Sequence, residues 1–148
     1  MPTHGEKRAM PYSARQMYDL IADVKSYPEF IPWIAAARIR SVTPPLHGVS
    51  MMDADLVVSF KVFREKFTSR VKLDEPGLAI DVDYLDGPFK YLRSRWQFHE
   101  VENGCEVEFF VDFEFRNAVL QKVIGVVFHE AMQRIVRAFE DRAKALYG

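Results

Sequence analysis

The sequence predicts an α+β domain in which a curved antiparallel sheet of six to seven strands wraps around one long C-terminal helix. Two changes in hydrophobic period support this fold class. Apolar residues recur at every second position between residues 34 and 115, and at helical spacing from residue 117 to about 147. The turns at 86–88 (Asp-Gly-Pro) and 102–104 (Glu-Asn-Gly) are too short for parallel crossovers, so neighbouring strands run antiparallel.

Two short helices are predicted after a first strand. The segment SARQMYDLIADV (residues 13–24) has apolar residues at helical spacing, with Ser13 as its N-cap and Gln16 completing a capping box. We expect Ser26 to cap a further single turn, with Pro28 near its start. Asn117 is the expected N-cap of the long helix, which at roughly 30 residues would measure about 45 Å.

Composition narrows the class of protein. The chain has 148 residues, a formal net charge of −1 and one cysteine. These values predict a single domain over residues 1–148, no intrachain disulfide and no overall attraction to nucleic acid. Neither the N-terminus nor any later stretch has an apolar run of the length that a signal peptide or a membrane span needs. We therefore expect a cytoplasmic protein, with peripheral contact at the inner face of the membrane left open.

Aromatic side chains are concentrated on the apolar face of the predicted sheet. One helix laid across six or seven curved strands leaves a volume that these side chains either fill or line. The stretch SYPEFIPWI (residues 26–34, here called the link) bears on the same question, because it carries unusually large apolar side chains for a connector. The back of the long helix is apolar at Val119, Val123 and Val126, and we expect the link to cover it. The link is then either a gate over a cavity or a fixed plug.

Few residues support catalysis. No histidine is placed by the pattern to face a buried substrate, and four candidate acid–base groups are expected to be exposed: His99, His129, Asp53 and Asp55. The sequence HEAMQ (residues 129–133) lacks the second histidine of a zinc helix, and no phosphate-binding or nucleophile motif is present. The sequence therefore predicts a protein that is not an enzyme and that holds no metal and no cofactor.

Some polar residues fall where apolar ones are expected: Glu65, Ser69 and Ser94 on the strands, and Arg142 on the apolar stripe of the long helix. They either lie at the margin of the sheet or orient a ligand by hydrogen bonds. A second polar feature, here called the basic ridge, alternates along the outer face of one strand: Arg64, Lys66, Arg70 and Lys72, with Lys61 nearby. The ridge is either a solvated face or a contact for anionic lipid or ribosomal RNA.

Three stretches resemble the coenzyme Q-binding family of START-like proteins, within the polyketide cyclase/dehydrase superfamily: PYSARQMYDLIADVKSYPEFIPW (11–33), GPFKYLRSRWQF (87–98) and VIGVVFHEAMQRIVRAFEDRA (123–143). The first is the most specific, because its aromatic and proline residues from Tyr27 to Trp33 fall at the family's spacing. Ile34 stands where the family often has a cysteine. The resemblance implies a helix-grip fold, an apolar cavity, and ubiquinone (coenzyme Q) as a bound ligand that supports bacterial respiration. The family also includes a branch of ribosome-associating toxins.

From this resemblance we expect the chain to bind ubiquinone or a similar lipophilic isoprenoid quinone between sheet and helix, as a carrier or chaperone. Two alternatives stay open, namely a ribosome-associated, toxin-like growth inhibitor and an aromatic cyclase-type enzyme. The candidate ligand-binding residues are Phe30, Trp33, Leu56, Val58, Phe60, Val82, Tyr84, Phe89, Trp96, Phe98, Phe109, Phe113, Ile124, Val127, Phe128, Ala131 and Ile135.

Overall fold

The protein was analysed as a computed structural model, which describes residues 3–60 and 63–148; the side chains of residues 60 and 63 lie outside the described part. The elements in chain order are β1 (Thr3–Met10), α1 (Ala14–Ala22), the 3-10 helix η1 (Val24–Glu29), β2 (Ile34–Val42), β3 (Val49–Phe60), β4 (Phe63–Asp74), β5 (Ala79–Asp86), β6 (Phe89–Val101), β7 (Gly104–Phe115) and α2 (Ala118–Tyr147).

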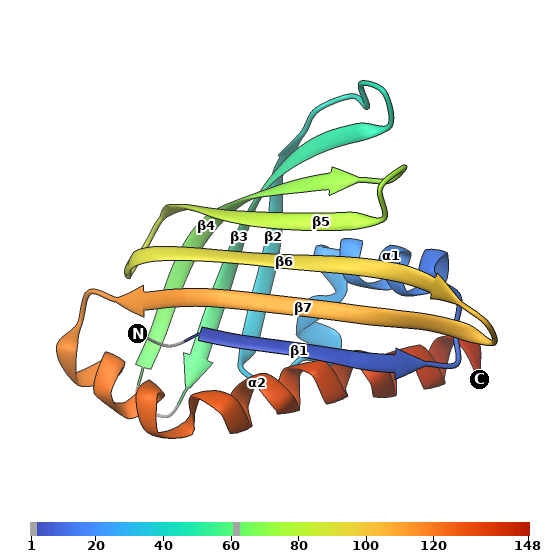
Figure 1. The fold of residues 1–148 in the computed structure, drawn as a ribbon. Coiled ribbons are helices and arrows are strands. Elements are labelled where there is room, and N and C mark those ends of the chain that lie inside the picture. The colour runs from blue at the N-terminus through green and yellow to red at the C-terminus, as the bar shows by residue number, and fades with distance from the viewer. Residues whose placement is uncertain (1–2, 61–62) are drawn as a thin grey trace.

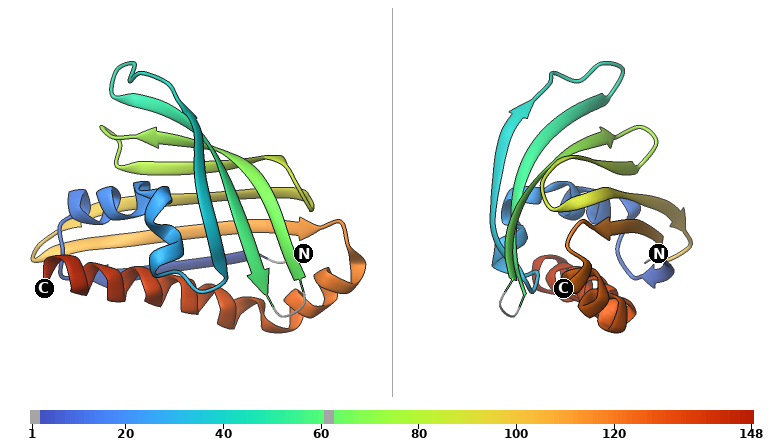
Figure 2. Two further views of the ribbon diagram at one scale, coloured as in Figure 1. Left: turned by 180° about the vertical axis from the view of Figure 1, so that it is seen from behind. Right: turned by 90° about the vertical axis from the view of Figure 1, so that its left-hand side faces the viewer.

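Among the described residues, seven strands form one sheet in the order β1-β7-β6-β5-β4-β3-β2, and every neighbouring pair is antiparallel. Strands β2 to β4 cross the others steeply, so the sheet curls, and α2 runs along its open side (Figures 1 and 2). The predicted α+β fold, with a curved sheet around a C-terminal helix and two short helices after the first strand, is confirmed.

The helix caps follow the sequence with one exception. The Ser13 hydroxyl accepts a hydrogen bond from the Gln16 amide, and the Gln16 side chain accepts one from the Ser13 amide, each at 3.0 Å, which confirms the capping box. The Asn117 side chain accepts hydrogen bonds from two amides in the first turn of α2. The prediction that Ser26 caps the second helix is wrong, because η1 begins at Val24 and the Ser26 hydroxyl donates to the Asp23 carboxylate at 2.6 Å.

Alternation along the strands separates an inner apolar face from an outer polar face, as predicted. On the outer face, Asp53 accepts hydrogen bonds from Arg70 at 2.9 and 3.1 Å. Both aspartates are less exposed than predicted, since Asp53 is half-buried and only 5% of Asp55 is accessible. The Thr68 hydroxyl donates to Asp55 at 2.5 Å and the Arg40 guanidinium lies 3.6 Å away, so cross-strand neighbours cover this carboxylate.

A polar cluster joins the edge strand β1 to α2. His4 is buried despite its position near the start of the chain, and its Nδ1 lies 3.1 Å from Nδ1 of His129. Its Nε2 lies 2.8 Å from the Glu6 carboxylate, while Arg8 reaches Glu140 of α2 at 3.3 Å. These contacts hold the helix against one edge of the sheet. His129 and His99 are themselves exposed, as predicted.

Candidate functional site

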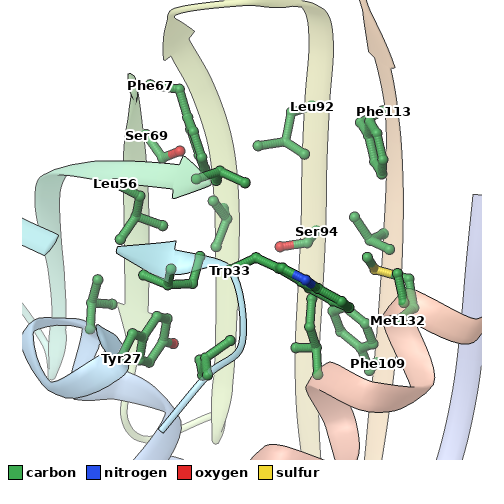
Figure 3. A pocket seen from close by; sticks show the side chains of 18 of the residues that line it. Tyr27, Trp33, Leu56, Phe67, Ser69, Leu92, Ser94, Phe109, Phe113 and Met132 are labelled. Carbon is green, nitrogen blue, oxygen red and sulfur yellow. The ribbon is translucent and has the colours of Figure 1, made fainter. Parts of the chain in front are cut away.

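An apolar cavity of about 260 Å³ lies between the inner face of the sheet, α2 and the link. Its wall is formed by Val24, Tyr27, Ile31, Pro32, Trp33, Ile34, Ala54, Leu56, Val58, Phe67, Ser69, Val71, Ile80, Val82, Phe89, Leu92, Ser94, Trp96, Phe109, Val111, Phe113, Phe115, Ile124, Ala131, Met132, Ile135 and Phe139. The sheet, α2 and the link each form part of this wall, and the link residues Ile31, Pro32 and Trp33 lie outside the helices and strands (Figure 3).

Most of the sequence-predicted site residues meet at this wall: Trp33, Leu56, Val58, Val82, Phe89, Trp96, Phe109, Phe113, Ile124, Ala131 and Ile135. They come from the link, from β3, β5, β6 and β7, and from α2. On α2 the cavity side is set by helical spacing, because residues separated by seven and eleven positions share one face. Trp33 points from the link into the cavity, toward Phe109 and Met132 (Figure 3).

Three predicted aromatic residues on the sheet and helix do not form this wall. Phe98 packs edge-on against Tyr18 of α1, with 6.0 Å between ring centroids. Tyr84 turns toward the start of β6, where its hydroxyl accepts a hydrogen bond from the Phe89 amide at 3.2 Å. Phe128 packs against Phe113 and against His4, at centroid distances of 5.1 and 6.2 Å. Each of these rings packs against a neighbouring element instead of the cavity. The strand and helix periods do not predict such contacts.

The remaining predicted residues also differ in position. Phe30 lies on the outer side of the link, where its ring contacts Phe139 at 5.4 Å and lies under the Arg142 guanidinium at 5.0 Å. Val127 lies at the margin of the helix stripe and is half-buried, off the cavity wall. The side chain of Phe60 lies outside the described residues.

Sequence reasoning missed several wall residues. Phe67, Leu92 and Val111 follow the inner alternation of their strands, so the period alone would have placed them on the correct face. Tyr27 and Ile31 belong to the link, whose apolar character was the available signal. The link nevertheless packs differently from the prediction. It contacts the C-terminal half of α2 through Phe139, while the apolar back of the N-terminal half is left exposed at Val119 (66%) and Val126 (83%).

Among the described wall residues, two serine hydroxyls, those of Ser69 and Ser94, point into the largely apolar cavity (Figure 3). Ser69 is only 2% exposed, and its Oγ has no hydrogen-bond partner among the described residues. Ser94 lies on the wall two strands away, on β6. A buried hydroxyl without a partner costs about 1–3 kcal/mol, so Ser69 Oγ is a ready donor for an acceptor atom inside the cavity.

The other polar candidates do not reach the cavity. Glu65 is exposed, and Arg142 forms an ion pair with Glu29 at 3.2 Å. The Tyr27 hydroxyl does border the cavity, but it donates to the Ile21 carbonyl, and burial raises its pKa far above the usual range. The described residues of the basic ridge are exposed, and Lys61 lies outside the described part.

The wall offers no ionised side chain for acid–base chemistry. Within the described part of the chain its residues include no Asp, Glu, His, Lys or Arg, and its only titratable group is the Tyr27 phenol. The same part contains no cluster of three His, Cys, Asp or Glu side chains placed to hold a metal ion. Of the helices in residues 3–60 and 63–148, none has the length and apolar character that crossing a bilayer requires. This arrangement suits the binding of a largely apolar molecule that carries a hydrogen-bond acceptor.

Comparison with known proteins shows which family shares this arrangement. The family described as "Polyketide cyclase / dehydrase and lipid transport" matches residues 10–140. The chain belongs to this family. An 18 kDa protein from Caulobacter crescentus, known from its solution structure, has the same fold with a TM-score of 0.83 and 36% identity, covering 100% of this chain and 99% of that one.

Two curated relatives of this family member carry different names. A protein of Rickettsia prowazekii named "Ribosome association toxin RatA" is 39% identical over 140 residues, which is 93% of this chain and 92% of the relative. A Xenopus laevis protein named "Coenzyme Q-binding protein COQ10 homolog B, mitochondrial" is 31% identical over 98% of this chain and 59% of the relative. This chain is therefore similar both to a protein named for ribosome association and to one named for coenzyme Q binding. Neither name describes an enzyme.

Proposed function

We propose that this protein binds a lipophilic isoprenoid quinone, such as ubiquinone, in the cavity, and that it acts as a carrier or chaperone without catalysing a reaction. The observation that carries the proposal is the cavity wall, which is largely apolar and has the inward hydroxyls of Ser69 and Ser94. A quinone matches this chemistry, because its ring is flat and apolar and carries two carbonyl acceptors on opposite sides. We take the binding unit to be one domain over residues 1–148.

The size of the cavity constrains how such a ligand would be held. Its volume of about 260 Å³ is slightly below the roughly 300–1,000 Å³ that is typical of small-molecule pockets. A head group fits this space better than a long isoprenoid tail does, so the tail would leave through the wall. The link is the suitable exit, because its residues 30–33 lie outside the helices and strands. A gate here would let a quinone pass between the cavity and a membrane surface.

The two tryptophans of the sequence provide a direct test, since both Trp33 and Trp96 lie on the cavity wall. Titration with a short-tailed ubiquinone should quench their fluorescence saturably, whereas an isoprenoid alcohol without the ring should not. Mass spectrometry of an organic extract of the purified protein should also detect a quinone. The proposal would be abandoned if neither saturable quenching nor a co-purified quinone were observed.

A second candidate function is association with the ribosome in the cytoplasm. It is favoured by the RatA relatives, which are similar over nearly the whole chain, and by exposed ridge cations that have no ion pair among the described residues, Lys66 and Lys72. Binding to ribosomal RNA should weaken steeply as salt rises. Co-sedimentation with the large subunit at two salt concentrations tests this function, and the double variant Lys66→Gln/Lys72→Gln should then sediment less. An aromatic cyclase activity finds no support in the wall, because its described residues include no acid–base pair.

A further inference from the structure

A second hollow lies on the outer side of the link, between it and α2. This groove, of about 510 Å³, is lined by Phe30, Pro32, Arg134, Arg137, Ala138, Asp141, Arg142 and Ala145. Pro32 lines both the groove and the cavity. At Pro32 the link therefore borders the apolar cavity and the groove at once.

Positive charge dominates the groove. Arg134 and Arg137 are exposed and form no ion pair within the described part of the chain. Arg142 forms an ion pair with Glu29 at 3.2 Å and lies over the Phe30 ring, so its positive charge is partly neutralised. Asp141 is the one carboxylate among the residues that line the groove. Two unpaired guanidinium groups thus remain on the surface beside the link.

The rest of the lining is apolar or small, namely Phe30, Pro32, Ala138 and Ala145. Guanidinium groups bind phosphate oxygens through two parallel hydrogen bonds, and an adjacent apolar surface suits the acyl chains of the same lipid. We propose that this groove docks the protein on an anionic phospholipid surface, with Arg134 and Arg137 on lipid phosphates and the link facing the bilayer. The inference deepens the proposed function, because it places the exit of the cavity against the surface from which a quinone would come.

The basic ridge provides a matched control for this proposal. Lys66 and Lys72 are exposed cations on the outer face of β4, and neither of them lines the groove. Arg134→Gln/Arg137→Gln and Lys66→Gln/Lys72→Gln each remove two positive charges, so both variants have the same net charge. Glutamine is close to arginine in helix propensity, so the groove variant should retain α2. A difference between the variants then reports the position of the charge and not its amount.

The experiment measures binding to vesicles of phosphatidylcholine alone and of phosphatidylcholine with phosphatidylglycerol. The wild-type chain should bind the anionic vesicles more tightly, and increasingly so as salt is lowered. The groove variant should lose about 30-fold in affinity, since each cation near an anionic surface contributes roughly 1 kcal/mol. The ridge variant should stay within about threefold of the wild type.

Equal losses in the two variants, or no preference of the wild type for anionic vesicles, would overturn the docking proposal. So would a groove variant that binds vesicles normally but no longer co-sediments with ribosomes, which would assign the arginines to RNA. Quinone titration in solution, without vesicles, separates this proposal from the proposed function. The groove variant should bind a short-tailed quinone normally, so loss of quinone binding in every chain would reject the cavity function and leave docking intact.

Discussion

Phe98 and Trp96 stand two residues apart on β6 and point to the same side of the sheet, yet they lie in different surroundings. Phe98 belongs to a closed region under α1, where it packs against Tyr18 and where Met17 and Cys105 are completely buried. Trp96 stacks on Phe109 at 4.1 Å and forms part of the cavity wall. The same strand therefore contributes to a filled core at one end and to a cavity in its middle.

The difference comes from what covers each region. The helix α1 presents a nearly continuous buried face to the sheet, formed by Ala14, Met17, Tyr18, Leu20 and Ile21. The middle of the sheet is covered by the link and by α2, whose cavity side includes the small Ala131. Strand alternation supplies an apolar surface in both places, but a close-packed core forms only where the cover fits that surface.

The largest contrast between the regions should appear in thiol reactivity. Cys105 is buried in the closed region, and burial raises its pKa to about 11. At pH 8 it should react with iodoacetamide more than about 100-fold more slowly than a free cysteine, whose pKa is about 8.5. Because the thiolate is disfavoured in the folded state, stability should also fall as the pH rises from about 8.5 toward 11.

A cysteine placed on the cavity wall provides the matched probe. Met132→Cys, made in a Cys105→Ser background, places a thiol on the cavity wall and should react markedly faster than Cys105 does. Mass spectrometry of samples quenched over time measures both rates. Equally slow labelling of the two thiols would show that the cavity is closed to small reagents.

The two tryptophans provide the next largest contrast. Trp96 is 6% exposed and stacked on Phe109, so Trp96→Ala should lower the free energy of unfolding by about 3–5 kcal/mol. Trp33 is half-buried in the link and faces the cavity, so Trp33→Ala should cost less than about 2 kcal/mol and should slow quinone uptake from vesicles. Urea unfolding and an uptake assay on both variants measure these effects. A large loss of stability in Trp33→Ala with normal uptake would make the link a plug.

Two isoleucines in helices make a smaller comparison. Ile21 is 1% exposed in α1, and Ile21→Ala should destabilise the fold by about 2–5 kcal/mol. Ile135 of α2 borders the cavity, so part of its side chain already lacks packing partners, and Ile135→Ala should cost only about 1 kcal/mol. Thermal or urea unfolding under identical conditions provides both values. If the two costs agreed, the volume under α2 would be filled in solution.

The smallest effect on stability is expected for Ser69→Ala. Removing an unpaired buried hydroxyl should leave the free energy of unfolding unchanged or slightly increased, by up to about 1 kcal/mol. Loss of a hydrogen bond to a carbonyl should at the same time weaken quinone binding about 3- to 10-fold. Ser41→Ala, at an exposed position on β2, is the control that should change neither quantity. Unchanged quinone affinity in Ser69→Ala would remove this serine from the binding site.

Local sequence signals were sufficient for two of the three predicted helix caps and for the inner face of the strands. The capping residues Ser13, Gln16 and Asn117 act through neighbours within three positions, so their roles can be predicted without the fold. Strand alternation likewise placed Leu56 and Val82 on the inner face, and both lie on the cavity wall. These predictions depend only on the period of a helix or strand, and the period is a property of the local chain.

Local sequence signals could not predict which side chains are buried by segments that are distant in the sequence. The sequence pattern places Asp55 on the surface, but in the fold Thr68 and Arg40 cover its carboxylate. His4 lies near the start of the sequence, but in the fold it contacts His129 of the C-terminal helix. The link was expected on the N-terminal half of α2, and it lies on the C-terminal half at Phe139.

The sequence alone therefore determined the α+β class, the antiparallel order of neighbouring strands and the apolar face of the sheet. The tertiary structure decided which part of that face is core and which part is cavity, as Phe98 and Trp96 illustrate. The physical reason is that side-chain alternation specifies a direction, whereas filling depends on the distance to the covering element. That distance is set by the curl of the sheet and by the seating of α1, the link and α2, which are packed together from remote parts of the chain.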